Sequence, residues 1–203
     1  MIIVQIATIP ERSGLIQRVI NSLKNQVDEV KVVHNSTTDG MKFYNHGLRS
    51  PDDIIFICDD DIIYPSGYVS TMLTYLKPGI VITCMGKIMR PRPIESFYRD
   101  ELIGYKTFET NDKMAQVEVP GTCAMAFHRS TCPDLDHTYF KSINSDIWMG
   151  IYCKENNIPC YVIPHKADWL TNLMPMLPLE TPSVFDRFKN NDTHMTELIN
   201  TRL

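Results

Sequence analysis

The chain has 203 residues, of which 43% are hydrophobic and 22% charged, so it can bury the core of a single domain. The formal net charge of −4 provides no basic surplus for a nucleic-acid backbone, and we expect no nucleic-acid partner. No apolar stretch is long enough to span a bilayer, and residues 1–10 lack the features of a signal peptide. The six cysteines lie mostly in apolar runs, which is typical of buried free thiols in a reducing compartment, so we expect a cytoplasmic protein.

The first third of the chain alternates apolar runs with helical patterns. Residues 2–7 and 54–58 are apolar runs typical of strands buried on both faces, and residues 30–33 are predicted to be a strand between them. Apolar residues recur at helical spacing over 15–23, and a shorter helical stretch covers 41–48. This β-α-β-α-β order predicts an α/β fold with a doubly wound, mostly parallel central sheet flanked by helices.

The remainder of the chain is more mixed and contains no internal repeat. Residues 87–112 are irregular and rich in charge, so we expect them to form a mobile loop over the site. Asn144 or Ser145 would cap a helix that follows. The expected helices are 66–76 and 146–155, the expected strands are 80–85, 117–119, 122–128 and 160–163, and two short helical pieces end the chain.

Three adjacent carboxylates, Asp59, Asp60 and Asp61, directly follow the third buried strand. They repel one another unless a cation or hydrogen-bond donors offset their charge. Hard oxygen ligands favour Mg²⁺ or Mn²⁺, which usually bind one or two carboxylates together with substrate phosphates. In an extended chain Asp59 and Asp61 would face one side and Asp60 the other. The alternative interpretation is a solvated acidic turn with helix-capping duties.

Polar residues follow each of the first three strands, at 8–12, 35–39 and 59–61. Ligands of doubly wound sheets bind beyond the carboxyl ends of the strands. We therefore expect these three segments to converge on one crevice.

These features resemble the GT-A fold nucleotide-sugar glycosyltransferases, in which a strand ends in a DxD motif. Residues 56–61 look like that strand and motif, and residues 32–35 look like the second strand and its nucleoside-binding turn. The likeness covers about residues 2–169, and glycosyltransferase domains of large algal viruses are similar. It implies a GT-A fold, which is Rossmann-like and doubly wound with a mixed, mostly parallel sheet. Further similar segments follow in the family's order at residues 8–12, 39–48, 119–127, 145–148 and 163–165.

The resemblance implies a Mn²⁺ or Mg²⁺ ion that bridges the two phosphates of a UDP-sugar. Asp61 matches the last aspartate of the motif and would be a metal ligand, and His165 would complete the metal site. Asp59 would bind the ribose, or the metal through water. Without the resemblance, His165 would be interpreted as a capping or core histidine.

The resemblance also implies a set of donor-binding residues. Asp39 would accept a hydrogen bond from the uracil imide, with Asn35 nearby, although both also suit an ordinary turn. Arg12 could bind a phosphate through its planar guanidinium, or be a surface residue at the start of a helix. The implied binding residues are Ala7, Thr8, Arg12, Asn35, Asp39, Lys42, Asp59 and Asp60.

Asp146 is the candidate catalytic carboxylate. In an inverting reaction it would be the general base for the acceptor hydroxyl, and in a retaining reaction it would stabilise or attack the anomeric carbon. Its alternative role is to complement the dipole of the helix that begins there. Gly121 would let the backbone approach the sugar, or would simply form the turn after Pro120.

The resulting hypothesis is a metal-dependent hexosyltransferase. It would move a hexose or deoxyhexose, such as glucose or rhamnose, from a UDP-sugar to a hydroxyl of a glycan or glycoprotein. A metal-dependent phosphohydrolase, a sugar nucleotidyltransferase and a non-catalytic nucleotide-sugar binding module are the alternatives. We expect one domain over residues 1–203, acting in the host cytoplasm if viral, with further domains possible in a longer chain. Its parts would be a nucleotide-binding half at 1–65, an acceptor and metal half at 80–170, and a tail at 171–203.

Overall fold

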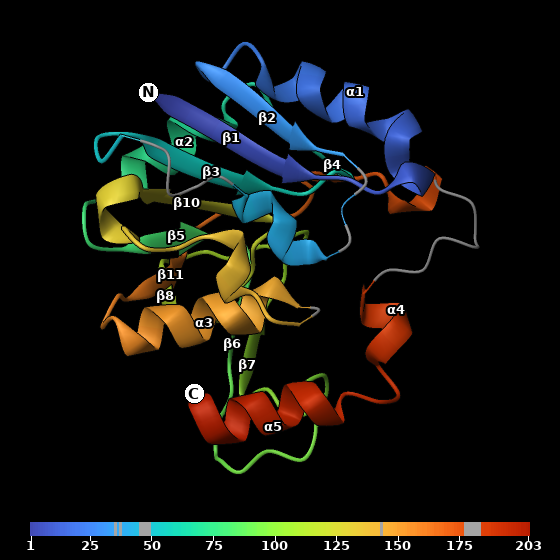
Figure 1. Ribbon diagram of the computed structural model, residues 1–203, viewed down its shortest axis with the longest axis vertical. Coiled ribbons are helices and arrows are strands. Elements are labelled where there is room, and N and C mark those ends of the chain that lie inside the picture. Colours follow the sequence, from blue (N-terminus) through green and yellow to red (C-terminus); the bar gives the residue numbers. More distant parts are fainter. Residues whose placement is uncertain (35, 37, 45–49, 143, 177–183) are drawn as a thin grey trace.

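The structure is a computed structural model of the chain, and it describes every residue except 35, 37, 45–49, 143 and 177–183. Seven strands form the central sheet in the order β2-β1-β3-β10-β5-β11-β8 (Figure 1). All run in one direction except β10 and β8, which are antiparallel to their neighbours. The strands are β1 (Ile2–Ala7), β2 (Glu29–Val33), β3 (Ile54–Cys58), β5 (Val81–Thr83), β8 (Ala115–Val117), β10 (Ala124–His128) and β11 (Cys160–Val162).

Helices cover both faces of this sheet, which explains why its strands are apolar at consecutive positions. Helices α1 (Ser13–Leu23) and α2 (Tyr68–Tyr75) pack with Val4 and Phe56 on one face. Helices α3 (Ser145–Glu155) and α5 (Thr193–Arg202) pack with Ile3 and Ile55 on the other face. The predicted α/β class, with a mostly parallel sheet flanked by helices, is confirmed and is consistent with a Rossmann-like GT-A fold.

The carboxyl ends of β2, β1 and β3 lie level with one another. Ala7 is paired with Val33, and Ile6 is paired with Cys58, so the last residues of the three strands are neighbours in the sheet. The polar segments that follow these strands therefore begin at the same edge, as expected.

Two sequence-based expectations need correction. The segment 87–112 is not only a loop, because β6 (Gly86–Ile88) pairs with β7 (Ile103–Tyr105) and with β9 (Val119–Pro120) in a second sheet. Apolar residues within this charged segment, including Phe97, are buried in the core beside α3 and α5. The helix expected over 41–48 is a 3₁₀ helix at Asp39–Phe43 (η2), and residues 45–48 lie outside the described part.

The cap of α3 and the two helices of the tail agree with what the sequence predicted. Asn144 caps α3, since its side-chain oxygen accepts a hydrogen bond of 3.3 Å from the backbone N–H of Ile147. The tail forms the two expected helical pieces, α4 (Val184–Phe188) and α5. All six cysteines are free and buried. The other elements are η1 (Pro10–Arg12), β4 (Ile62–Ile63), η4 (Arg129–Thr131), η5 (His137–Tyr139), β12 (Thr171–Asn172) and η6 (Met174–Met176).

Helix α5 is anchored to the segment that precedes β7. Asp192, at the start of α5, accepts hydrogen bonds from the hydroxyl of Ser96 at 2.7 Å and from the backbone N–H of Tyr98 at 3.0 Å. The tail therefore fixes a segment whose next residues line the cleft described below. Across the described part of the chain, no helix has the length and apolar character needed to cross a membrane.

Candidate active site

A cleft of about 790 Å³ lies beyond the carboxyl ends of β1 and β3. Its volume falls within the range typical of small-molecule sites. The residues that line it come from segments far apart in the sequence. These segments meet because the ends of β2, β1 and β3 are level with one another and the start of α3 lies beside them. Eight of the residues singled out from the sequence line it: Ala7, Arg12, Asp39, Lys42, Asp59, Asp60, Asp61 and Asp146.

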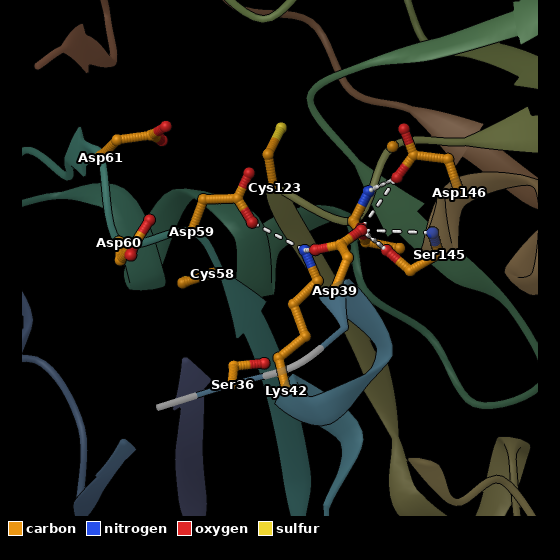
Figure 2. A network of polar contacts seen from close by, with 12 residues as sticks. Ser36, Asp39, Lys42, Cys58, Asp59, Asp60, Asp61, Cys123, Ser145 and Asp146 are labelled. Carbon is orange, nitrogen blue, oxygen red and sulfur yellow. Dashed lines mark hydrogen bonds and ion pairs between the residues drawn. The ribbon is translucent and has the colours of Figure 1, made fainter. Parts of the chain in front are cut away.

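The acidic run forms a turn rather than an extension of β3. One guanidinium nitrogen of Arg12, Nη1, lies 2.8 Å from both Asp60 Oδ1 and Asp61 Oδ2. Asp59 instead points toward Lys42, and its Oδ1 lies 2.7 Å from Lys42 Nζ (Figure 2). The alternation expected for an extended chain is therefore wrong, because the turn places Asp60 and Asp61 on the same cation.

Tyr64 fixes the start of this turn. Its hydroxyl accepts a hydrogen bond from the backbone N–H of Asp59 at 2.9 Å and donates one to the carbonyl of Cys123 at 2.6 Å. The ring is buried, and burial raises the pKa of Tyr64 well above its ordinary value, so the phenol stays protonated. Sequence reasoning missed this residue, since an apolar pattern does not reveal what a buried phenol binds.

Lys42 is the central cation of a second set of contacts. Its side chain is 2% exposed, and Nζ lies 2.9 Å from Asp39 and 2.7 Å from Asp59. Burial acts to lower the pKa of Lys42, but the charges of Asp39 and Asp59 outweigh it and raise the pKa well above its ordinary value. Lys42 therefore remains charged and holds the two carboxylates together.

A line of polar contacts leads from Asp39 to Asp146, at the start of α3 (Figure 2). Asp39 Oδ2 accepts hydrogen bonds from both the backbone N–H and the hydroxyl of Ser145. The Ser145 hydroxyl oxygen lies 2.6 Å from that of Thr122. Thr122 in turn binds Asp146 Oδ1 through its backbone N–H and its hydroxyl, both at 2.8 Å. Asp39 thus already has partners on both oxygens, and the role on uracil stays a prediction.

The carboxylates of the cleft differ in how easily they hold a proton. Burial, helped by the charge of Asp59, raises the pKa of Asp61 to about 7. Burial, helped by the charge of Asp39, raises the pKa of Asp146 to about 6. Asp39 has a lowered pKa, because Lys42 and Ser145 outweigh the effect of its burial. The pKa of Asp61 is raised although Arg12 lies beside it, because burial and the charges of Asp59 and Asp60 outweigh the effect of that cation.

The residues present fit a divalent cation in part. Asp59 and Asp61 supply the hard oxygen donors that Mg²⁺ and Mn²⁺ prefer, and the excess negative charge favours such an ion. Within the described ranges, no group of three or more histidine, cysteine or acidic side chains is arranged to hold a metal. An ion bound here would therefore need phosphate or water oxygens to complete its coordination.

The expected third ligand, His165, is not among the residues that line the cleft. Its backbone pairs with Asn111, and its ring is buried with Nδ1 2.9 Å from the carbonyl of Ile163. Within the described residues, Nε2 is buried without a hydrogen-bond partner. The strand-end position was correctly predicted, but the ring is held against its own segment, so the geometry gives no support for a role beside Asp61.

Neither Gly121 nor Thr8 is among the residues that line the cleft. A Cβ at Gly121 would lie 2.6 Å from the Cε atom of Met85. Its small size is required by the packing against Met85, and the approach of a sugar to its backbone stays a prediction. Thr8 is buried and links β1 to the chain after β2, since its N–H bonds to Val33 and its carbonyl accepts from Ser36. Asn35 lies outside the described residues.

The cleft also contains residues that sequence reasoning did not select. Tyr98 and Tyr105 come from the segment first expected to be a loop, and Phe185 comes from α4. Thr122, which lines the cleft, and Ser145, which lies behind it, belong to the segments 119–127 and 145–148 singled out from the sequence, but neither hydroxyl had been given a role. The structure places these hydroxyls between Asp39 and Asp146. Side-chain hydrogen bonds between residues so far apart in the chain cannot be predicted from a single sequence.

No protein-family model matches the chain, and no curated protein matches it. Among solved structures, the chain is similar to A197 from STIV, with 14% sequence identity and a TM-score of 0.48. The match covers 83% of this chain and 82% of that one. At this TM-score the match adds nothing to the fold, which rests on the strand order and directions given above.

Proposed function

We propose that the protein is a metal-dependent glycosyltransferase that moves a hexose or deoxyhexose from a UDP-sugar to a hydroxyl of a glycan. The observation that carries this proposal is the shared cleft of the acidic turn after β3 and of Asp146 at the start of α3. The first provides charged groups for a diphosphate and its cation, and the second provides a carboxylate for the acceptor hydroxyl.

On the donor side, the chain's own residues would bind and orient the diphosphate. Arg12 offers further guanidinium N–H groups that suit phosphate oxygens, in addition to the nitrogen that contacts Asp60 and Asp61. The ion pair of 2.7 Å with Lys42 keeps the Asp59 carboxylate in place. A Mn²⁺ or Mg²⁺ ion held by Asp61 and Asp59 would act as a Lewis acid on the leaving diphosphate.

On the acceptor side, Asp146 would take the proton of the attacking hydroxyl. Thr122 occupies one of its oxygens, Oδ1, and the other takes no part in these contacts. A pKa of about 6 leaves Asp146 ionised at neutral pH while making it a better base than an ordinary carboxylate. Such a base serves direct displacement at the anomeric carbon, which inverts its configuration.

The test is nucleotide release from a panel of UDP-sugars, measured with and without Mn²⁺. We expect metal-dependent release by the wild type and its loss in Asp61→Asn. The matched control is Asp112→Asn, because the side chain of Asp112 is 80% exposed, forms an ion pair with Lys166 on the surface and does not line the cleft. We expect that control to keep wild-type activity.

The other outcomes would favour other functions. Absence of metal-dependent binding or release with every UDP-sugar would overturn the proposal. Release of phosphate from simple phosphate esters would favour a phosphohydrolase, and tight UDP-sugar binding without turnover would favour a binding module.

A further inference from the structure

The contacts between Asp146 and Asp39 contain fewer protons than they need. Three oxygen pairs lie in a row: Asp146 with Thr122, Thr122 with Ser145, and Ser145 with Asp39. Each pair needs one proton between its oxygens to be a hydrogen bond. The two hydroxyls supply one proton each, because a serine or threonine hydroxyl carries a single hydrogen. When both carboxylates are ionised, one of the three pairs therefore faces oxygen to oxygen without a proton.

Bulk water cannot reach this row to replace the missing hydrogen bond. Thr122 is 1% exposed and Ser145 is fully buried, so the contact between their hydroxyls is closed to bulk water. An unsatisfied contact between buried polar atoms carries a free-energy cost, because neither oxygen can turn to water instead. The row is thus strained in the state in which Asp146 and Asp39 are both negative.

One added proton relieves this shortage. If Asp146 carries a proton on Oδ1, it can donate to Thr122, Thr122 can then donate to Ser145, and Ser145 donates to Asp39. All three contacts are then hydrogen bonds that point in the same direction. The proton belongs on Asp146 rather than on Asp39, because Lys42 lies 2.9 Å from Asp39 and favours its negative form.

We infer that the hydroxyls of Thr122 and Ser145 form a proton-deficient chain between Asp146 and Asp39, which is completed when Asp146 gains a proton and which thereby strengthens Asp146 as a base. This inference deepens the proposed function, since it assigns Thr122 and Ser145 as positioning residues of the proposed base. In the transfer, the acceptor O–H bond breaks and its proton passes to the oxygen of Asp146 that Thr122 does not contact. A half-turn of the carboxyl group about its Cβ–Cγ bond then places the protonated oxygen beside Thr122, where it completes the chain. The acceptor oxygen bonds to the anomeric carbon, and the diphosphate leaves with the electron pair of the broken bond.

The inference makes opposite predictions for two neighbouring hydroxyls. Ser145→Ala removes the competing contact, so the Thr122 hydroxyl can donate to ionised Asp146 without leaving another pair unprotonated. We expect the pKa of Asp146 to fall by about one pH unit, the size expected for one hydrogen bond. Thr122→Val removes the donor itself and should raise that pKa, and Thr122→Ser should restore it. If Ser145 only supported the helix, its removal would not lower the pKa of Asp146.

No charged group around Asp146 is removed in these variants. The charged and titratable groups there are Asp39 and Lys42 from η2, Tyr98 from the segment before β7, and Cys123 from the turn before β10. In Ser145→Ala, Asp39 loses one hydroxyl donor but keeps the backbone N–H of residue 145 and Lys42, so we expect it to stay ionised. The effect of these groups on Asp146 is therefore shared by the wild type and the hydroxyl variants, and does not decide the sign of the difference.

The experiment is a ¹³C NMR titration of side-chain carboxyl groups in the metal-free protein, with the Asp146 signal identified by its loss in Asp146→Asn. The matched control is Ser96→Ala, because Ser96 is also buried and also donates to an aspartate, Asp192, at 2.7 Å. It should leave the titration of Asp146 unchanged. An unchanged or raised pKa in Ser145→Ala would overturn the inference.

The wild type offers a second measurement that needs no folded variant. As the pH falls through the titration of Asp146, completion of the chain should produce hydroxyl proton resonances that are protected from exchange and shifted downfield. Their absence at every pH would overturn the inference. Neither measurement requires a donor or an acceptor, so their outcome is independent of whether UDP-sugar transfer is found.

Discussion

Two acidic regions face the same cleft, and their charge is offset in different ways. The turn at Asp59, Asp60 and Asp61 is held by the cations Arg12 and Lys42. Asp146 is held by the neutral N–H and hydroxyl groups of Thr122. Both regions contain a carboxylate with a raised pKa, about 7 for Asp61 and about 6 for Asp146, so the partners and not the pKa values distinguish them. In the proposed function, a divalent cation would displace the proton from Asp61 at the charged turn, whereas Asp146, beside neutral donors, would exchange a proton with the acceptor.

The largest expected effect comes from removing the buried cation that joins the acidic turn to Asp39. Lys42→Met would leave Asp39 and Asp59 without their buried partner, so we expect the free energy of unfolding to fall by about 3–5 kcal/mol at pH 7. Chemical denaturation measures this change. The loss should shrink near pH 4, where the two carboxylates can take up protons.

A matched control for this variant is Lys31→Met. Lys31 is 39% exposed and lies 3.5 Å from Glu29 on β2, so its loss should change stability by less than about 0.5 kcal/mol. Equal losses of unfolding free energy in the two variants would show that the burial of Lys42 does not strengthen its ion pairs. The acidic turn would then not depend on a buried cation, which would contradict the comparison made above.

The second effect separates the regions by activity. Asp146→Asn should lower kcat at least about a hundredfold, since it removes the proposed base, while UDP binding in the presence of Mn²⁺ stays close to that of the wild type. In the wild type, kcat should fall as the pH drops through about 6, because protonated Asp146 cannot accept a proton. Rate measurements with saturating donor, together with calorimetric UDP titrations, would show this. Loss of UDP binding in Asp146→Asn would place Asp146 on the donor side instead.

The sequence was most informative where chemistry is local. The apolar runs predicted β1, β2 and β3, and the polar residues at their ends correctly predicted a shared crevice. The outward direction of Asp60 was wrong, because it assumed an extended chain where the backbone turns. The place of His165 was also not foreseen, since the direction of a ring after a strand depends on neighbours such as Asn111.

The same limit explains what sequence reasoning missed. The segment 87–112 seemed irregular because its charges hide a few apolar residues, whose partners in α3 and α5 lie far along the chain. The hydrogen bond between Ser145 and Asp39 likewise joins residues that are 106 positions apart in the sequence. Such contacts follow from the tertiary fold and cannot be inferred from spacing within one segment.

A third prediction concerns a substitution that would displace the N–H and hydroxyl donors of Thr122 without changing any charge. Gly121→Ala would place a Cβ 2.6 Å from Cε and 2.9 Å from Cβ of Met85, so the backbone before Thr122 must shift. We expect a loss of about 1–3 kcal/mol in unfolding free energy from this overpacking. Thermal or chemical denaturation gives the value. The double variant with Met85→Ala should recover the part of the loss that Cε causes, while the Cβ of residue 85 at 2.9 Å and its backbone oxygen at 3.2 Å stay in place. No recovery at all would show that the Cε atom is not an obstacle.

The smallest effect concerns stability as a function of pH. Burial and the charge of Asp39 raise the pKa of Asp146 to about 6, from an ordinary value near 3.8. Its ionised form therefore costs stability, fully above pH 6, progressively less between pH 6 and 4, and not at all below that range. Asp146→Asn carries no charge at any of these values, so it should be more stable than the wild type by about 1 kcal/mol at pH 8, after allowance for solvent screening. The difference should vanish as the pH falls to 4. Denaturation curves at several pH values would reveal it, and a variant less stable than the wild type at pH 8 would mean that Thr122 compensates the charge as completely as Lys42 does for Asp39.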